Sequence, residues 1–387
     1  MEPHTEPRSR KAKTVHIVGM YKCGTSWLLH CLAAHPEILA WREFDPYVAS
    51  LIRESPRSNP ARRIVSLLHT LTGRLDLAHG HHRFTPRPNG DSFTEFFLGT
   101  GWVPLYGKQK QQAAQRLLPT HPSAVPQVAD QLFEMLEKPF RPESAPLYDP
   151  AEFHNTLGIV NFKRSSLIEL MTSVLECNTS AEMPKAFYDY VTQLSDPNGL
   201  VAFKAADQIM SLQLLQRDMP NTKVVAVVRD ARDAMVSAWK FEALMQTIEA
   251  PWGKNSQTRN LIEFMYAWGV RAAAIMQAAS ENKLLLIRYE DLHDNFSETI
   301  ARVYRYIGVD WSPEAIANIR NATDFEKVSG GRKKGEEAES VVRKGIVGDW
   351  RNVLSPSQAA LAWRVARRQM TALGYTREGV VTAPPQL

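Results

Sequence analysis

The chain has 387 residues, of which 44% are hydrophobic and 22% are charged, and this ordinary composition excludes a disordered, collagenous or coiled-coil protein. Its three cysteines, Cys23, Cys31 and Cys177, form no CxxC pair. Neither a disulfide scaffold nor a cysteine-based zinc site is therefore expected, and a reducing compartment fits. The formal net charge of +5 suits an anionic ligand but is too small to indicate nucleic acid as a partner.

The N-terminal stretch does not resemble an export signal. It opens with acidic, proline and basic residues and lacks the apolar run of about 7–15 residues that a secretory signal needs. The sequence also contains no run of about 18 apolar residues, so we expect no transmembrane segment and a cytoplasmic location. We predict a flexible basic leader over residues 1–13, a single domain over 14–375 and a tail over 376–387.

Four short apolar segments are candidate strands, over residues 14–19, 200–204, 223–228 and 283–287. The segment KVVAVV at 223–228 is continuously apolar, as is typical of a parallel strand buried on both faces. Helical patterns cover about 25–35, 208–218, 231–248, 257–279, 296–307, 312–320 and 356–373. Strands that alternate with helices predict an α/β protein whose parallel β-sheet is flanked by helices.

Residues 50–199 interrupt this alternation. They are rich in proline, arginine and histidine, with helical patches at 107–118 and 127–137, and we expect a largely helical insertion. Its cluster of His79, His81 and His82 has no supporting carboxylates, so an exposed polar loop is a better interpretation than a metal site. A second polar stretch, SGGRKKGEEAES at 329–340, is expected to be a mobile loop.

The loop after the first strand, MYKCGTSW at 20–27, predicts a phosphate site. A strand, a glycine-bearing loop and a helix start direct backbone N–H groups at an anion. Gly19 and Gly24 have the spacing of the nucleotide-triphosphate loop GxxxxGK(S/T), but Thr25 stands at its lysine position and the lysine is Lys22. The loop therefore departs from the ATP and GTP pattern. The alternative is an ordinary turn with a surface lysine.

Arg229 directly follows the strand at 223–228, where a guanidinium can bind a phosphate through two hydrogen bonds. In the helix expected after it, Asp233 and Ser237 are four residues apart and share a face. An ATPase would more naturally place an aspartate at this strand end to hold magnesium. Arg229 thus favours a metal-free phosphate site, and the alternative is a capping and salt-bridge cluster.

A third motif near the C-terminus, RKGIVGDWRN at 343–352, joins two cations to a glycine. Glycine allows the backbone to approach an anion closely, while Arg343 and Lys344 supply positive charge.

In this order, the three motifs resemble the sulfotransferase family that uses 3′-phosphoadenosine 5′-phosphosulfate as sulfuryl donor. The family's loop PKSGTTW is matched here at Lys22, Gly24, Thr25 and Trp27. This chain differs from the family's loop at Tyr21, which replaces proline, at Cys23, which replaces serine, and at Ser26, a conservative replacement of threonine. The family motif RKGxxGDWKN differs from this chain only at Arg351. The resemblance extends over about 14–49 and 200–370, with none recognised within 50–199, and it implies a P-loop fold with a central parallel sheet.

The resemblance also implies which residues bind the donor, without a metal. The loop at 22–27 would bind the 5′-phosphosulfate. The 3′-phosphate would be bound by a strand-end arginine, a serine eight residues later and the RKG motif. Aromatic residues would contact the adenine. The donor-binding residues implied are Lys22, Cys23, Gly24, Thr25, Ser26, Trp27, Arg229, Ser237, Tyr289, Thr323, Phe325, Arg343, Lys344 and Gly345.

For catalysis, the resemblance implies that Lys22 stabilises the leaving phosphate. Small-molecule sulfotransferases carry a Lys-Thr-His segment whose histidine is the general base, but Ala206 stands at that position here. Glycan-type members instead use a glutamate after an HP dipeptide and the first helix, and Glu43 matches it, with Lys204 as a second cation. Asp207 is the alternative base, followed by a residue of the insertion such as His154.

The resemblance thus implies sulfuryl transfer to a hydroxyl or amine of a small-molecule, lipid or glycan acceptor. Neither the acceptor nor the oligomeric state can be predicted. Two alternatives remain. A P-loop kinase or NTPase would bind ATP or GTP with magnesium, and a non-catalytic 3′-phosphoadenosine 5′-phosphate binding protein would explain the absent histidine.

Overall fold

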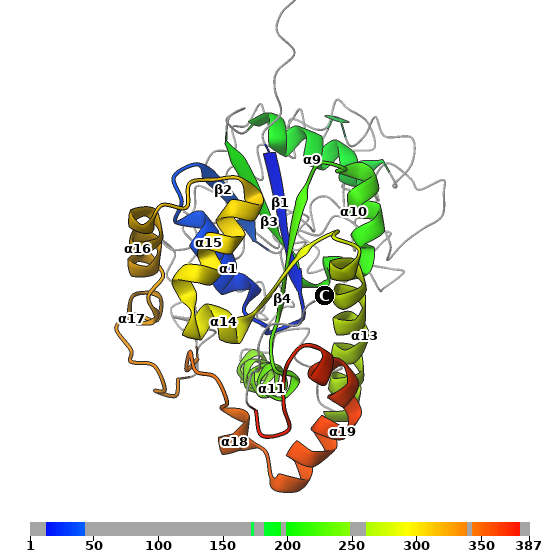
Figure 1. Cartoon of the computed structure of the whole chain (residues 1–387), viewed down its shortest axis with the longest axis vertical. Coiled ribbons are helices and arrows are strands. Elements are labelled where there is room, and N and C mark those ends of the chain that lie inside the picture. The colour runs from blue at the N-terminus through cyan, green and yellow to red at the C-terminus, as the bar shows by residue number, and fades with distance from the viewer. Residues whose placement is uncertain are drawn as a thin grey trace, which may run out of the picture.

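The structure is a computed structural model that describes residues 13–42, 172–173, 182–194, 199–247, 261–338 and 343–379. These residues form a five-stranded parallel sheet in the order β2-β3-β1-β4-β5 (Figure 1). The strands are β1 (Lys13–Gly19), β2 (Ile38–Arg42), β3 (Leu200–Lys204), β4 (Lys223–Val228) and β5 (Leu285–Arg288).

Both faces of the sheet are buried. Along β4, Val224, Ala226 and Val228 belong to the hydrophobic cluster on one face, while Val225 and Val227 belong to the cluster on the other. Successive side chains of a strand point to opposite faces. A strand covered on both sides must therefore be apolar throughout, which is why KVVAVV contains no alternation.

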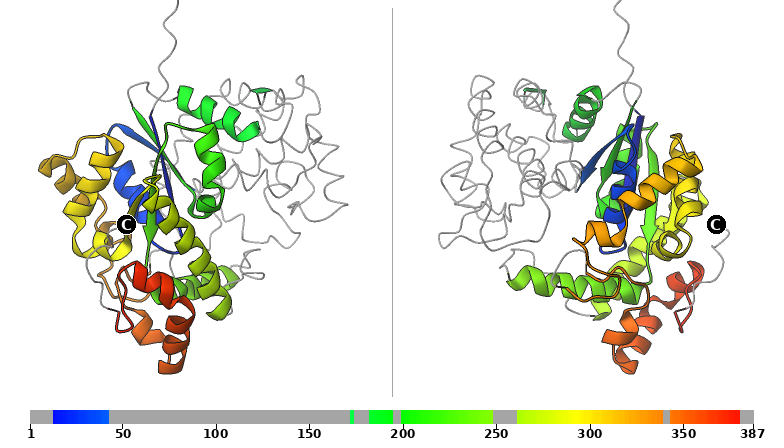
Figure 2. Two further views of the ribbon diagram at one scale, coloured as in Figure 1. Left: turned by 45° about the vertical axis from the view of Figure 1, so that its right-hand side comes forward. Right: turned by 90° about the vertical axis from the view of Figure 1, so that its left-hand side faces the viewer.

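Helices cover each face and make a three-layer α/β/α arrangement. One cluster receives side chains from α10 (Leu212–Asp218), α11 (Ala231–Thr247), α13 (Leu261–Ser280) and α19 (Pro356–Ala372). The other receives them from α1 (Thr25–Ala33), α14 (Tyr289–Asp294), α15 (Phe296–Ile307) and α16 (Pro313–Ala322). Figures 1 and 2 show these two groups on opposite sides of the strands.

The shorter elements are α9 (Met183–Leu194), the 3₁₀ helix η3 (Ala206–Ser211), α17 (Phe325–Val328) and α18 (Trp350–Val353). The starts of α16 and α19 follow from their sequences. Ser312 and Ser355 accept hydrogen bonds from backbone N–H groups of the first turn, and a proline follows each serine. A serine cap followed by proline is a strong helix start signal.

The topology places one crevice at the carboxyl ends of the strands. β1 lies between β3 and β4, with α1 on one face and α10 on the other. Ligands of open α/β sheets bind where connections leave the sheet in opposite directions. The loops after β1 and β4 are therefore the first places to look for a site.

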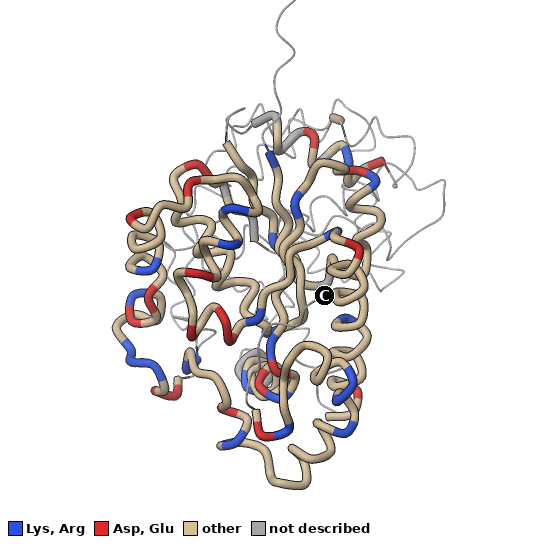
Figure 3. The backbone as a smooth tube through the Cα atoms, in the orientation of Figure 1, with Lys and Arg blue, Asp and Glu red and all other residues tan. Residues whose placement is uncertain are grey.

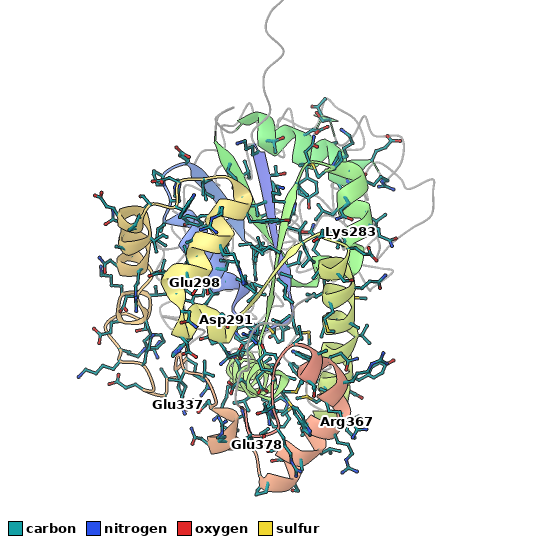
Figure 4. All side chains as sticks on the ribbon, in the orientation of Figure 1. Lys283, Asp291, Glu298, Glu337, Arg367 and Glu378 are labelled. Atoms are coloured by element: carbon teal, nitrogen blue, oxygen red, sulfur yellow. The ribbon has the colours of Figure 1, made fainter. Side chains whose placement is uncertain are left out.

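The predicted fold class, an α/β protein with a parallel sheet and flanking helices, is confirmed. The strand β2 was not predicted, and the helix predicted over 208–218 is divided into η3 and α10. The strand predicted over 283–287 lies at Leu285–Arg288 instead, with Lys283 exposed before it (Figure 4). Lys13 belongs to β1 and not to the leader, because it pairs with Leu200.

Most of the predicted insertion, including the patches at 107–118 and 127–137 and the cluster His79, His81 and His82, lies outside the described residues. Its described part includes α9, in keeping with a helical insertion. Within the described ranges, no helix has both the length and the apolar character needed to span a bilayer. The same ranges hold no group of three or more His, Cys, Asp or Glu residues arranged for a metal ion.

Candidate active site

The connection between β1 and α1, residues 20–24, is here called the first loop. Its backbone is left-handed at Lys22 (φ 63°) and Gly24 (φ 91°). A side chain at position 24 would collide with the ring of Tyr289, so glycine is needed for both the conformation and the space. The tight turn, closed by a hydrogen bond from Cys23 N to Met20 O (3.1 Å), presents the amino end of α1 at the carboxyl edge of the sheet.

The side chains of the first loop divide into two groups. Lys22 Nζ lies 4.0 Å from the centroid of the Phe241 ring on α11, a cation–π contact. Cys23 is buried instead, as is Thr25 at the start of α1, and burial raises the pKa of the Cys23 thiol to about 12. The thiol therefore stays neutral, and only the backbone of Cys23 is suited to face an anion.

Of the four residues predicted to contact adenine, Tyr289 lies directly against Gly24 of the first loop. The Trp27 ring on α1 lies 5.6 Å from that of Tyr289, the first residue of α14. Thr323 is buried at the end of α16, with its hydroxyl 3.7 Å from the sulfur of Cys31 on α1. Phe325 is buried and packs directly against Gly345. These contacts link α1 to α14 and to the end of α16, and they link α17 to Gly345.

Arg229 lies at the carboxyl end of β4 and is buried. Its Nη2 donates to the carbonyl oxygen of Ile346 (3.0 Å) and lies 3.8 Å from Asp233 Oδ2. The guanidinium also stacks 4.2 Å from the centroid of Tyr289, and its buried Nε has no hydrogen-bond partner within the described structure. Burial alone would lower the pKa of Arg229, but Tyr289 and Asp233 raise it, so the guanidinium stays charged.

Residues 343–349 are here called the second loop, and Asp233 in the first turn of α11 holds it in place. The Asp233 carboxylate accepts hydrogen bonds from the backbone N–H groups of Gly348 (2.6 Å) and Trp350 (2.9 Å). Ser237 lies one turn further along α11 and is half-buried. Sequence spacing placed Asp233 on the face of Ser237 but gave no sign that it anchors a segment 115 residues away.

The cations of the second loop are paired with carboxylates. Arg343 hydrogen-bonds to Asp349, and Lys344 Nζ lies 3.1 Å from the same carboxylate. Both cations also contact Glu337, at 3.0 Å from Arg343 Nη1 and 2.8 Å from Lys344 Nζ. Burial opposes ionisation of Asp349, but hydrogen bonds from Arg343 and Asn352 lower its pKa to about 2. Asp349 is therefore a permanent counter-ion.

A buried network around Glu290 was not predicted. Glu290 accepts hydrogen bonds from Asp230 N (3.0 Å) and from the Tyr375 hydroxyl (2.9 Å), and burial raises its pKa to about 7. Next to it, Arg232 forms a salt bridge with Asp230 (2.7 Å) and stacks on Trp350 (3.9 Å). The network ties the ends of β4 and β5 to the C-terminal segment and so fixes the base of the site.

The residues predicted to act on the acceptor side are only partly described. Lys204 is buried at the carboxyl end of β3, in register with Arg42, the last residue of β2. Glu43 is the next residue in the chain, and both Glu43 and His154 lie outside the described residues. Asp207 lies in η3, directly after β3.

The site therefore defines a class: an α/β protein with a tight glycine-bearing loop after β1, predicted to bind phosphate, and an arginine, in place of an aspartate, after β4. The family model described as the sulfotransferase domain matches residues 129–374. Because this is more than half of the chain, the protein belongs to the sulfotransferase family. The match includes 129–199, a part of the chain in which the sequence motifs gave no recognisable resemblance.

Curated relatives are distant. Sulfotransferase 2A1 of Macaca fascicularis is 24% identical over 163 residues, which cover 39% of this chain and 57% of the relative. A 3-alpha-hydroxysteroid sulfotransferase of Cavia porcellus is 23% identical over 165 residues, covering 40% of this chain and 57% of that protein. The chain thus spans little more than half the length of these relatives.

Solved structures give a similar result. The mouse sulfotransferase SULT7A1 complexed with PAP has a TM-score of 0.36 and 19% identity, covering 45% of this chain and 67% of the other. The sulfotransferase domain from the curacin biosynthetic pathway has a TM-score of 0.44 and 13% identity, covering 95% and 99%. Both TM-scores are below 0.5, so the fold assignment depends on the sheet described above.

Proposed function

We propose that this protein transfers a sulfuryl group from 3′-phosphoadenosine 5′-phosphosulfate to a hydroxyl or amine of an acceptor. The observation that carries the proposal is the hydrogen bond from Arg229 to the carbonyl oxygen of Ile346, which joins two motifs that are predicted to bind phosphate and lie 117 residues apart. Two cationic segments that meet at one sheet edge, beside a phosphate loop on the neighbouring strand, suit a nucleotide with two separated anionic groups.

The described residues fit such a donor. The first loop would hold the 5′-phosphosulfate, with backbone N–H groups and the hydroxyls of Thr25 and Ser26. Arg229, Ser237 and the second-loop residues Arg343, Lys344 and Gly345 would hold the 3′-phosphate. Arg229 has a buried Nε without a partner, so its guanidinium retains donor capacity for an anion. Trp27, Tyr289, Thr323 and Phe325 would surround the adenine.

The reaction is an in-line displacement at sulfur. The acceptor oxygen or nitrogen forms a bond to sulfur while the bond from sulfur to the bridging phosphate oxygen breaks, and that oxygen keeps the electron pair. The acceptor's proton passes to a base. Negative charge develops on the leaving phosphate and the sulfuryl oxygens, so the protein contributes positioning and cationic stabilisation. Lys22 would stabilise the leaving phosphate, and Lys204 the sulfuryl group.

The base in this proposal is Glu43, with Asp207 as the alternative and His154 as a third candidate. Glu43 is the residue after Arg42 in the sequence, and Arg42 ends β2 in register with Lys204 at the carboxyl edge of the sheet. A carboxylate base would need a raised pKa or a tight hydrogen bond to the acceptor to act near neutral pH.

Sulfur-labelled donor, incubated with a panel of alcohols, phenols, hydroxysteroids and amines, tests the proposal. Label transfer to at least one class, lost in Glu43→Gln but kept in Asp207→Asn, is the expected result. Transfer that is lost only in Asp207→Asn would mean that Asp207 in η3, and not Glu43, is the base. Binding of 3′-phosphoadenosine 5′-phosphate without transfer to any acceptor would favour a non-catalytic binding protein instead.

A further inference from the structure

The cations predicted to bind the 3′-phosphate already have an anionic partner besides Asp349. Glu337 places its two carboxylate oxygens 3.0 and 3.1 Å from Arg343 Nη1, and one of them lies 2.8 Å from Lys344 Nζ. One carboxylate thus bridges both cations, as a phosphate group would. Figure 3 shows basic and acidic residues close together along the connection from α17 to α18.

The two carboxylates around this cation pair differ in their surroundings. The Asp349 side chain is only 2% exposed and is also held by Asn352 Nδ2 (3.2 Å), so Asp349 is part of the fold. The Glu337 side chain is 49% exposed and projects from the polar connection, where Figure 4 labels it. Of the two, Glu337 is the carboxylate that a ligand can replace.

Two hydrogen bonds to backbone carbonyl oxygens of the second loop bring Glu337 to this position. Gly335 N donates to the carbonyl oxygen of Lys344 (2.9 Å), and Arg332 Nη1 donates to that of Arg343 (2.7 Å). These bonds align the segment that precedes Glu337 with the start of the second loop. The neighbouring Glu336 instead bonds to the backbone N–H of Lys333 within its own turn (3.1 Å), so the two adjacent glutamates have different roles.

Charge balance shows the consequence of this contact. Arg343 and Lys344 supply two positive charges, and Asp349 and Glu337 supply two negative ones. A phosphate monoester that carries about −1.5 to −2 near pH 7 would meet a neutral cluster and a repelling carboxylate. Burial tends to raise the pKa of Glu337, but hydrogen bonds from Lys344 and Arg343 lower it, so this carboxylate is ionised at neutral pH.

We propose that Glu337 competes with the 3′-phosphate of the nucleotide for Arg343 and Lys344. The Glu337 carboxylate must leave these two cations before a 3′-phosphorylated nucleotide can bind there. The inference depends on the proposed function, since it takes these cations as the 3′-phosphate site. Glu337 would weaken binding of donor and product alike, because both carry this phosphate, and would so favour product release. It would not affect nucleotides without a 3′-phosphate.

The test compares Glu337→Gln with Glu336→Gln, a matched change of the adjacent glutamate. Each variant and the wild type are titrated calorimetrically with 3′-phosphoadenosine 5′-phosphate and with adenosine 5′-phosphate, which lacks the 3′-phosphate. We expect Glu337→Gln to lower the dissociation constant of 3′-phosphoadenosine 5′-phosphate about threefold to tenfold. Glu336→Gln should change it less than about twofold, and neither variant should change adenosine 5′-phosphate binding.

Three outcomes would overturn the inference. Bisphosphate affinity that is unchanged or weaker in Glu337→Gln, with normal wild-type binding, would contradict the competition but leave the proposed function intact. Equal tightening in both variants would indicate a general charge effect. No bisphosphate binding by any of the three proteins would contradict the proposed function itself. Glu337→Ala, which also removes the carboxylate, should reproduce the tightening, and unchanged thermal unfolding would exclude a folding effect.

Discussion

The first and second loops both carry cations at the carboxyl edge of the sheet, but they are built in opposite ways. The first loop is local: one strand, five residues with two left-handed backbone positions, and one helix start. The second loop depends on distant residues, because Asp233 accepts hydrogen bonds from its backbone and Arg229 donates one to the carbonyl oxygen of Ile346. Its cations are neutralised by Asp349 and Glu337.

This difference suggests a division of work. A local loop fixed by backbone conformation is preorganised, which suits the group that reacts. A loop whose cations exchange one carboxylate for another suits a group that only has to be bound and released. Substitutions in the first loop should therefore lower the rate of transfer, whereas substitutions in the second loop should change the affinity for the nucleotide.

Removal of the first loop's cation should have the largest effect. Lys22→Ala is expected to reduce transfer about 10³-fold, equivalent to about 4 kcal/mol of transition-state stabilisation, while 3′-phosphoadenosine 5′-phosphate still binds within a modest factor. Single-turnover transfer and calorimetry measure the two effects separately. Lys240→Ala, at an exposed lysine on α11, is the control, and full turnover in Lys22→Ala would remove this residue from catalysis.

Arg229→Ala should show the opposite pattern. The loss of a buried guanidinium that binds phosphate should weaken 3′-phosphoadenosine 5′-phosphate by about 2–4 kcal/mol. Calorimetry measures the change, with Arg367→Ala on the exposed face of α19 as the control (Figure 4). An unchanged dissociation constant in Arg229→Ala would mean that the 3′-phosphate binds elsewhere.

Asp233→Ala should detach the second loop without touching the first. The change leaves two backbone N–H groups and the nearby Arg229 without their buried acceptor, and we expect unfolding to become easier by about 3 kcal/mol. Denaturant unfolding measures the loss. Asp324→Ala, which removes a single exposed cap of α17, should cost about 1 kcal/mol. Equal losses in the two variants would contradict the anchoring role of Asp233.

A further prediction concerns the pH dependence of stability. The pKa of Glu290 is raised from 4.5 to about 7 by burial, so the folded state binds more protons than the unfolded state between these values. Stability should therefore fall as pH rises from about 4.5 to 7, by at most about 3 kcal/mol, and stay constant above that. Denaturant unfolding at several pH values measures this dependence, and Glu290→Gln should abolish the fall in stability between pH 4.5 and 7. A fall of the same size in Glu290→Gln would mean that another group causes it.

The sequence predicted the parts of the fold that depend on local pattern. KVVAVV could be recognised as β4 because both faces of that strand are buried, and the first loop because its glycines and Lys22 lie within one short segment. β2 was missed since ILAWR directly follows a histidine, a proline and a glutamate. Only its pairing with β3 makes it a strand.

The roles of Asp233 and Glu290 were missed because their partners lie far away in the chain. Asp233 bonds to residues more than 100 positions later, and Glu290 to Tyr375, 85 positions later. Neither partner can be inferred from spacing. Glu337 was part of a stretch predicted only as a polar loop, and its contact with both cations appears only in three dimensions.

The central claim is that the two loops form one site for an adenine nucleotide with a 3′-phosphate. Calorimetric titration of the wild-type protein with 3′-phosphoadenosine 5′-phosphate and with ATP, both without metal, tests it most directly. We predict micromolar or tighter binding of the bisphosphate and much weaker binding of ATP. Binding of neither nucleotide, or of ATP alone and only with magnesium, would contradict the account and favour a kinase-like function.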